Sequence, residues 1–305
     1  MHLAIDFEPR PTGYYPPNAK ASHESQNRTV NYTRSHRRCP EHASHCRTWF
    51  FTQTKAVVSV RRQWHPGATP CCHTGILLRQ SAAILDSAIA GITNARPDIV
   101  LIPGDLTKDG ELVSHQAVAE VLRRLRDAGI KVFVCPGNHD IANPEAVAFD
   151  GADVSPVPSV TPGEFASFYA EFGYGNASFR DPNSLSYVAE PVPGLRILAM
   201  DVCRYDRNTN NTSFVGGYFD SARWNWITNQ LDQARAQGKL VIGMMHHRVT
   251  EHYLGQKMLF PEYVVDDYEF VRETFAHSAA VQPALDCSST VRSSSDRSVR
   301  HALHR

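Results

Sequence analysis

Three short apolar segments, each followed directly by polar side chains, constrain this 305-residue chain more than any other feature. They span residues 99–103, 131–135 and 240–245, and their length and Val/Ile content are typical of buried β-strands. Gly-Asp follows the first at 104–105, Gly-Asn-His-Asp follows the second at 137–140, and His-His follows the third at 246–247. Ligands at the ends of neighbouring strands meet at one edge of a sheet, so the pattern predicts a metal site there.

The segments between these strands carry a helical repeat. Apolar residues recur at three- and four-residue spacing in 81–92, 116–128 and 220–237, with Asp220 as the expected N-cap of the last helix. We also expect a helix near 162–172 and a hairpin that pairs 185–189 with 195–200. Alternating strands and helices predict an α/β layered fold for a core at residues 56–275.

The order of the polar blocks resembles that of the calcineurin-like metallophosphoesterases, whose signature reads D-x-H, G-D, G-N-H-D/E, H and G-H-x-H. Residues 104–105, 137–140 and His246 match the central three blocks, in order and each after a strand. The resemblance covers roughly residues 76–275 and implies a two-sheet α/β/β/α sandwich. The loop at 104–111 looks more like that of phosphodiesterase-type relatives than that of protein phosphatases, which carry a D-R-G continuation.

The first and last blocks of the signature have no match in the chain. The strand before the first block is expected at 56–59, but Val60, Arg61 and Arg62 stand in place of D-x-H. No G-H-x-H follows the third block. In the family the missing residues hold most of the first metal, and two guanidinium groups there would repel a divalent cation. Another interpretation is that both ends are read out of frame, because the resemblance stops where each missing block should begin.

The resemblance implies a role for each matched residue. Asp105 would be the carboxylate shared by two divalent ions, and Asn138 and His246 would hold the second ion through an amide oxygen and an imidazole nitrogen. His139 would lie beside the substrate phosphate, where it stabilises charge or protonates the leaving oxygen. Asp140 would accept the other ring N–H of that histidine and fix its tautomer.

Other interpretations of these residues remain open from the sequence. Asp105 fits a loop cap, Asn138 beside glycine fits a turn, and Asp140 fits the N-cap of a following segment. His247 is the alternative to His246 as the ligand, because neighbours on an extended strand face opposite ways.

Four further features near these blocks have no assigned chemistry. Asp109 and Glu111 are interpreted as solvated loop charges, with metal binding as the alternative. Asp201 follows a strand and is left outside the site. The aromatic-rich segment 248–267 follows the ligand strand, and it either overhangs the site as a specificity loop or packs its aromatic rings.

The implied reaction is in-line attack on phosphorus by hydroxide that two divalent ions (Mn, Fe or Zn), about 3.5–4 Å apart, activate. The substrate would be a small phosphoester, either a phosphodiester such as a cyclic nucleotide or a phosphomonoester. Asp105, Asn138 and His246 alone give one ion three ligands and the other ion one, so we expect impaired activity. The alternative function is a catalytically inactive family member that binds phosphate, one metal ion or a partner.

Charge and composition separate the ends from the core. Residues 1–75 carry 10 Lys/Arg against 4 Asp/Glu, and residues 277–305 carry 4 against 2, whereas the whole chain is neutral. Residues 1–55 and 276–305 lack apolar periodicity and are rich in Arg and Ser, which predicts disorder. Nucleic-acid binding by the basic arm is disfavoured, because its charge follows no helical stripe and few aromatic residues interrupt it.

No signal peptide or membrane span is legible, so the cytoplasm is the default compartment. The four cysteines of the N-terminal arm, at 39, 46, 71 and 72, form no C-x2-C pair, which disfavours structural zinc. Cys135 and Cys203 lie in strand-like contexts and are expected to be buried thiols.

Overall fold

A computed structural model describes residues 80–278 apart from 151–152, 211 and 252, and also the strand residues 3–4, 31–32, 48–50 and 281–285. The chain divides into two units, residues 1–37 and 38–305. In the first unit, β1 (Leu3–Ala4) and β2 (Asn31–Tyr32) form an antiparallel pair. All further elements belong to the second unit.

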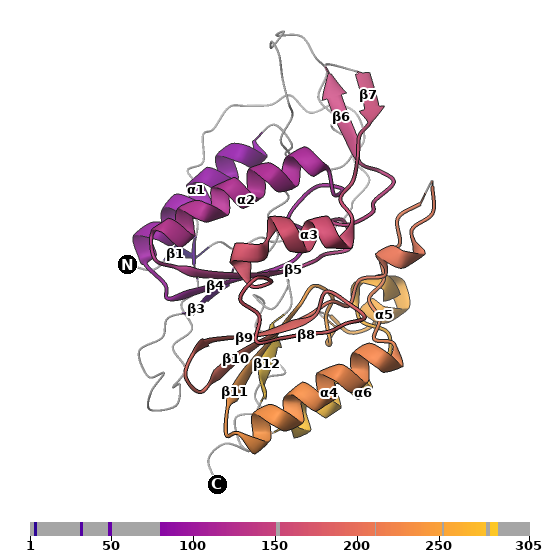
Figure 1. The fold of residues 1–305 in the computed structure, drawn as a ribbon. Coiled ribbons are helices and arrows are strands. Elements are labelled where there is room, and N and C mark those ends of the chain that lie inside the picture. Colours follow the sequence, from indigo (N-terminus) through magenta and orange to yellow (C-terminus); the bar gives the residue numbers. More distant parts are fainter. Residues whose placement is uncertain are drawn as a thin grey trace. The chain divides into compact units, whose positions relative to one another are not determined.

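Two sheets form the core of the described part of the second unit (Figure 1). One is parallel, in the order β3 (Thr48–Phe50), β4 (Ile99–Pro103) and β5 (Lys131–Cys135). The other has the order β12 (Val281–Leu285), β11 (Leu240–Met245), β10 (Leu195–Met200), β9 (Tyr187–Val192) and β8 (Phe179–Arg180). β10, β11 and β12 run parallel, whereas β8, β9 and β10 pair antiparallel.

Helices cover the outer faces of the two sheets (Figure 1). α1 (Ser81–Ala95) and α2 (Leu112–Asp127) lie on the three-stranded sheet, and α4 (Ser221–Ala236) and α6 (Tyr268–His277) lie on the five-stranded sheet. Because β5 contacts β10 and β4 contacts β11, the inner faces of the sheets meet. The predicted α/β/β/α sandwich is confirmed.

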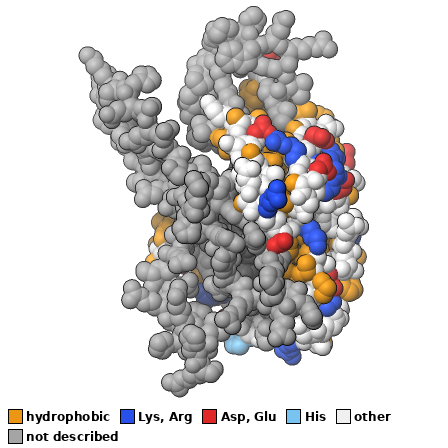
Figure 2. Space-filling view, turned by 90° about the vertical axis from the view of Figure 1, so that its left-hand side faces the viewer, with side chains coloured by type: hydrophobic (Ala, Val, Ile, Leu, Met, Phe, Trp, Pro, Cys, Tyr) orange, Lys and Arg blue, Asp and Glu red, His pale blue; other side chains and the backbone are white. Residues whose placement is uncertain are grey.

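Shorter elements connect these layers. They are the hairpin β6 (Val147–Asp150) and β7 (Asp153–Pro156), the helix α3 (Pro162–Phe168), and the single turns η1 (Ala170–Phe172), η2 (Tyr205–Arg207), α5 (Gln256–Leu259) and η3 (Pro261–Tyr263). The described surface that faces the viewer in Figure 2 interleaves acidic and basic side chains.

Local sequence signals account for most element boundaries. β4 and β5 have the predicted limits, and Asp220 caps α4 by accepting the backbone N–H of Arg223 at 2.8 Å. α2 begins at Leu112, four residues before the predicted start, and ends before Gly129, whose φ is 79°. The helix predicted at 162–172 is interrupted after Phe168 and continues as η1.

The strand beside β4 differs from the prediction. Thr48–Phe50 pairs with β4, whereas the predicted strand at 56–59 and Val60, Arg61 and Arg62 lie outside the described residues. β12 pairs with β11 although it falls inside the tail 276–305 for which composition predicted disorder, because its backbone completes the sheet edge. The rest of that tail and most of residues 1–55 are not described, so the domain limits stay a prediction.

Candidate metal centre

The carboxyl ends of β4, β5 and β11 bear the three predicted ligands. Asp105 lies two residues beyond β4, Asn138 three residues beyond β5, and His246 directly beyond β11. β4 and β5 are neighbours in one sheet, and β11 of the other sheet contacts β4. All three side chains are buried. Residues more than 100 positions apart in the chain therefore reach one place.

The ligand atoms of these side chains converge. Nε2 of His246 lies 3.0 Å from Oδ1 of Asn138 and 3.4 Å from Oδ1 of Asp105. Nδ1 of His246 donates to the carbonyl oxygen of Pro103 at 3.0 Å. A carbonyl only accepts, so Nδ1 carries a proton, and in the neutral ring the Nε2 lone pair faces the two oxygens. Two oxygens and one imidazole nitrogen suit Mn, Fe or Zn.

The donor set is small. Within the described ranges, no group of three or more His, Cys, Asp or Glu side chains is placed to hold a metal ion. Among the described residues, the amide of Asn138 joins Asp105 and His246 at this point. These residues therefore fit one divalent ion.

Two glycines bring the loops after β4 and β5 into backbone contact. Gly104 has φ 84°, and a Cβ there would lie 2.5 Å from the backbone nitrogen of Gly137. A Cβ on Gly137 would in turn lie 2.4 Å from Oδ1 of Asp105. Asp105 itself has φ 54°, a left-handed conformation that is uncommon outside glycine and that Asp tolerates better than most residues. The close approach fixes the Asp105 carboxylate against the 137–140 turn.

His139 pairs with a different carboxylate from the one predicted. Its Nδ1 donates to Oδ1 of Asp109 at 2.8 Å, so the assignment of Asp140 as its partner is wrong. Asp109 is only 3% exposed rather than solvated, and it also contacts Lys108 and accepts from Nδ2 of Asn143 at 3.3 Å. The His139 side chain is 25% exposed and thus accessible to solvent. Asp109 therefore fixes the orientation of an accessible imidazole.

Asp140 instead joins the two loops. Its Oδ1 accepts the backbone N–H and the hydroxyl of Thr107 at 2.9 and 3.0 Å, and its Oδ2 accepts the N–H of Gly137 at 2.8 Å. The side chain is fully buried. The N-cap interpretation is also wrong, because the next element is the strand β6. Asp140 thus positions the turn that carries Asn138 and His139.

A buried histidine that the sequence interpretation missed supports the same turn. Nε2 of His115, on α2, donates to the carbonyl oxygen of Asp140, and its Nδ1 accepts the hydroxyl of Tyr169, both at 2.8 Å. Burial lowers the pKa of His115, which favours the neutral ring. The available signal was its position on the buried side of α2 with Val118 and Leu122.

His247 and Asp201 have structural contacts. Nε2 of His247 donates to the carbonyl oxygen of Val215, away from Asp105 and Asn138, so the geometry favours His246 as the ligand. Burial, with a smaller effect from His246, lowers the pKa of His247 to about 3. The buried Asp201 carboxylate accepts two backbone N–H groups and the hydroxyl of Tyr205.

Three buried groups complete the surroundings of the site. Glu111, expected to be solvated, is 3% exposed and accepts the N–H of Asp109, and burial raises its pKa. Cys135 and Cys203 are buried thiols, as predicted.

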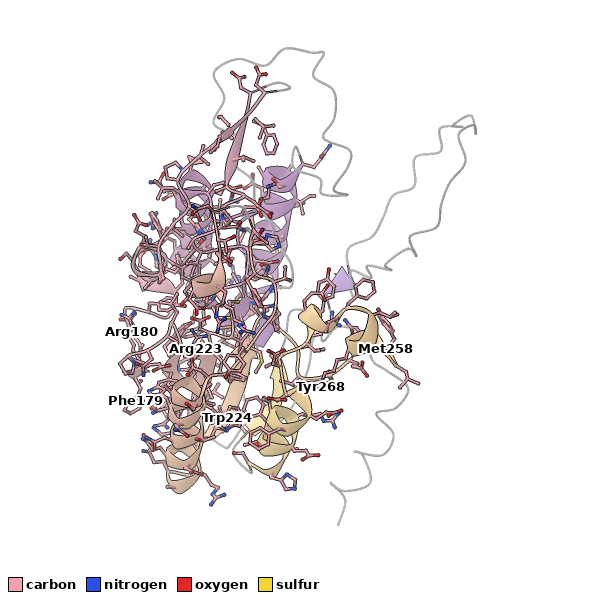
Figure 3. All side chains as sticks on the ribbon, turned by 90° about the vertical axis from the view of Figure 1, so that its right-hand side faces the viewer. Phe179, Arg180, Arg223, Trp224, Met258 and Tyr268 are labelled. Atoms are coloured by element: carbon pink, nitrogen blue, oxygen red, sulfur yellow. The ribbon has the colours of Figure 1, made fainter. Side chains whose placement is uncertain are left out.

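The segment after the ligand strand is an exposed excursion. Arg248 pairs with Val264, and α5 and η3 lie between them. Leu254, Met258 and Leu259 are 99%, 82% and 62% exposed, and Figure 3 shows Met258 away from the sheets. Whether this segment overhangs the site stays a prediction.

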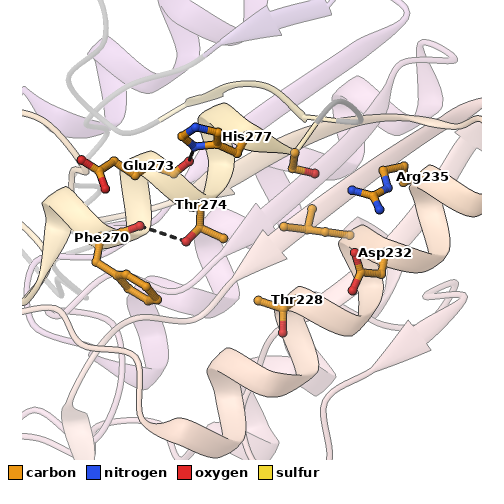
Figure 4. Close-up of a pocket in the computed structure, with 9 residues that line it drawn as sticks. Thr228, Asp232, Arg235, Phe270, Glu273, Thr274 and His277 are labelled. Carbon is orange, nitrogen blue, oxygen red and sulfur yellow. Dashed lines mark hydrogen bonds between the residues drawn. The ribbon is translucent and has the colours of Figure 1, made fainter.

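A separate groove of about 480 Å³ lies between α4 and α6 (Figure 4). Thr228 and Asp232 of α4 line one side, and Phe270 and His277 of α6 line the other. The groove contains none of the residues at the strand ends.

Comparison with known proteins shows the family to which the chain belongs. The family model of the calcineurin-like phosphoesterases matches residues 69–278, which is more than half of the chain. The chain therefore belongs to the calcineurin-like phosphoesterase family. This family consists of phosphoester hydrolases and implies divalent metal ions, as predicted.

Two individual proteins illustrate the similarity. A "probable cyclic nucleotide phosphodiesterase" of Vesicomyosocius okutanii subsp. Calyptogena okutanii (strain HA) is 35% identical over 65 residues, which are 21% of this chain and 27% of that protein. The crystal structure of a dimetal phosphatase from Danio rerio is similar with a TM-score of 0.45 and 16% identity, over 67% of this chain and 70% of that one.

In the described ranges, no helix combines the length and apolar content needed to cross a membrane.

Proposed function

We propose that this chain is a metal-dependent phosphoester hydrolase that acts on a small phosphodiester or phosphomonoester. The observation that carries the proposal is the convergence of Asp105 Oδ1, Asn138 Oδ1 and His246 Nε2 at the ends of three strands from two sheets. Family membership supports the reaction class. The similarity to a probable cyclic nucleotide phosphodiesterase favours a phosphodiester such as a cyclic nucleotide.

Each residue has a distinct task in this proposal. Asp105, Asn138 and His246 hold a divalent ion, which supplies Lewis acidity toward phosphoryl oxygen and water. His139 protonates the leaving oxygen from Nε2 of its doubly protonated ring, and the Asp109 carboxylate holds that ring in position through Nδ1. Asp140 maintains the turn through its contacts with Thr107 and Gly137.

A catalytically inactive member that binds phosphate, one metal ion or a partner is the second candidate. It is favoured by the sequence itself, which contains neither D-x-H nor G-H-x-H, and by a described donor set that fits one ion. The two candidates share the metal ligands and differ in turnover.

The deciding experiment measures metal ions bound per chain after loading with manganese or zinc, together with hydrolysis of bis(4-nitrophenyl) phosphate and 4-nitrophenyl phosphate. Asp105→Ala is the blank, and Asp181→Ala is the matched control because Asp181 is equally buried but bonds only within residues 181–186. The enzyme is supported if the wild-type chain and Asp181→Ala bind metal and hydrolyse the substrates, whereas Asp105→Ala does neither. Bound metal without hydrolysis supports the inactive candidate, and metal content unchanged in Asp105→Ala refutes the ligand assignment.

The double variant Val60→Asp, Arg62→His tests the missing first block. Activity should rise in this variant if residues 60–62 occupy the position of D-x-H. An inert double variant would indicate that the missing C-terminal histidines limit the activity instead.

A further inference from the structure

The segment 203–218, between β10 and α4, is attached to both sides of the candidate site. Nδ2 of Asn208 donates to the carbonyl oxygen of Ala142 at 3.0 Å, two residues after the 137–140 turn. The carbonyl oxygen of Val215 accepts from Nε2 of His247, the neighbour of His246. The segment therefore spans from the ligand turn of one sheet to the ligand strand of the other.

Phe214 lies between these two attachments. Its backbone N–H donates to Oδ1 of Asn208 at 2.7 Å, so one side chain links Phe214 to Ala142. Ser213, the preceding residue, donates to Glu145 at 3.3 Å, and Val215, the following residue, contacts His247. The residues around Phe214 are therefore bonded both to the stretch that follows the 137–140 turn and to His247, the neighbour of the ligand His246.

The Phe214 ring is exposed and yet held in place. It is 37% exposed, and the guanidinium carbon of Arg204 lies 4.6 Å from its centroid. Arg204 also lies 4.9 Å from the ring of Tyr218 and pairs with Asp266 at 3.2 Å. The Arg204 guanidinium thus contacts two aromatic rings and an acidic side chain. These contacts restrict the side chains of Arg204 and Phe214 before any ligand binds, so less conformational entropy is lost on binding.

We propose that Phe214, supported by Arg204, is a stacking surface for a planar aromatic group on the phosphoester substrate, either a nucleobase or an aryl group. The inference rests on the proposed function, because the phosphate of the same ligand would be held by the strand-end residues. An aromatic ring stacks on the face of any base or aryl group. The surface therefore selects aromatic over aliphatic phosphoesters, without hydrogen bonds that distinguish one base from another.

The test measures the affinity of the manganese-loaded full chain for AMP and for ribose 5-phosphate, which lacks the base. Stacking of one base on an aromatic side chain should make AMP bind about 10- to 100-fold more tightly. Phe214→Ala should abolish this preference, Phe214→Leu should abolish it although apolar volume remains, and Phe214→Trp should retain it.

Phe179→Ala is the matched control. Phe179 is 39% exposed and lies 5.3 Å from the guanidinium of Arg196, but it belongs to the edge strand β8, which β9 and β10 separate from β11 (Figure 3). The preference for AMP should be unchanged in this variant. A second pair of ligands, phenyl phosphate and ethyl phosphate, separates the sources of the aromatic group. An equal preference for the phenyl ester identifies a general aryl surface, and a preference for AMP alone identifies a nucleobase surface.

The outcomes separate the two proposals. An AMP affinity no higher than that of ribose 5-phosphate, including no binding of either, contradicts the stacking surface, as does a preference that survives Phe214→Ala. Ribose 5-phosphate binding that persists in Asp105→Ala contradicts the proposed metal site. Even with that result, a preference for AMP that depends on Phe214 supports the stacking surface separately.

Discussion

The two halves of the candidate site are built differently. Loops after β4 and β5 are buried and bonded to each other, with Asp140 accepting from Thr107 and Gly137. Segments after β10 and β11 bear exposed side chains, such as Phe214 and Leu254. The first half fixes chemical groups through buried polar contacts, which leave these groups little freedom to move. The second half presents apolar surface that a ligand can cover.

The largest expected effect tests the chemical role of the buried half. His139→Ala should retain bound metal and lower turnover by about 10²–10⁴-fold, because the proton donor is lost while Asp105, Asn138 and His246 remain. The measurement is kcat for bis(4-nitrophenyl) phosphate together with metal content. Loss of the metal in this variant would make His139 a ligand and contradict the assigned role.

Asp140→Ala should have the next largest effect. It removes the acceptor of three buried donors, so the free energy of unfolding should fall by about 2–4 kcal/mol. Urea denaturation of the metal-free chain measures this loss. Asp181→Ala, which disrupts only contacts within residues 181–186, should cost about 1 kcal/mol. Equal losses in the two variants would show that Asp140 does not join the loops.

The pH dependence of stability tests burial in the first half. Burial raises the pKa of Glu111 above 4.5, so between pH 4.5 and the raised value the folded chain binds more protons than the unfolded chain. The stabilisation is present below pH 4.5 and is lost as pH rises through the folded pKa. Glu111→Gln should remove this decline, which for one group is at most about 1.4 kcal/mol per pH unit.

Urea denaturation from pH 4 to 8 measures that slope, and Glu120→Gln is the matched control because its side chain is 74% exposed. The control should keep the wild-type slope. If Glu111→Gln has the same slope as the wild-type chain, groups other than Glu111 cause the fall in the free energy of unfolding with pH.

The smallest expected effect belongs to the exposed half. Leu254 is 99% exposed, so Leu254→Ser should change the free energy of unfolding by less than about 0.5 kcal/mol. Val264→Ala, at the buried base of the same excursion, should cost about 0.5–3 kcal/mol. A large loss in Leu254→Ser would mean that this side chain is covered in solution, and analytical ultracentrifugation would then show whether a second copy covers it.

Prediction from sequence succeeded where a short segment contains its own signal. The apolar runs at β4, β5 and β11 and the cap at Asp220 depend on neighbouring residues, and the structure has them as predicted. The partner of His139 could not be predicted in this way. Asp140 is adjacent in sequence, whereas Asp109, 30 positions away, is the residue that the contact between the two loops brings to Nδ1.

The sequence by itself therefore determined the class of fold, the family and the residues at the three strand ends, because strand periodicity and the polar blocks are local patterns. Only the tertiary structure decided that Asp109 is buried against His139, that His115 supports the turn, and that the Asn208 side chain links Phe214 to Ala142. The physical reason is that burial and hydrogen-bond partners depend on which loops meet. Here they meet because Gly104 and Gly137 allow two backbones to touch.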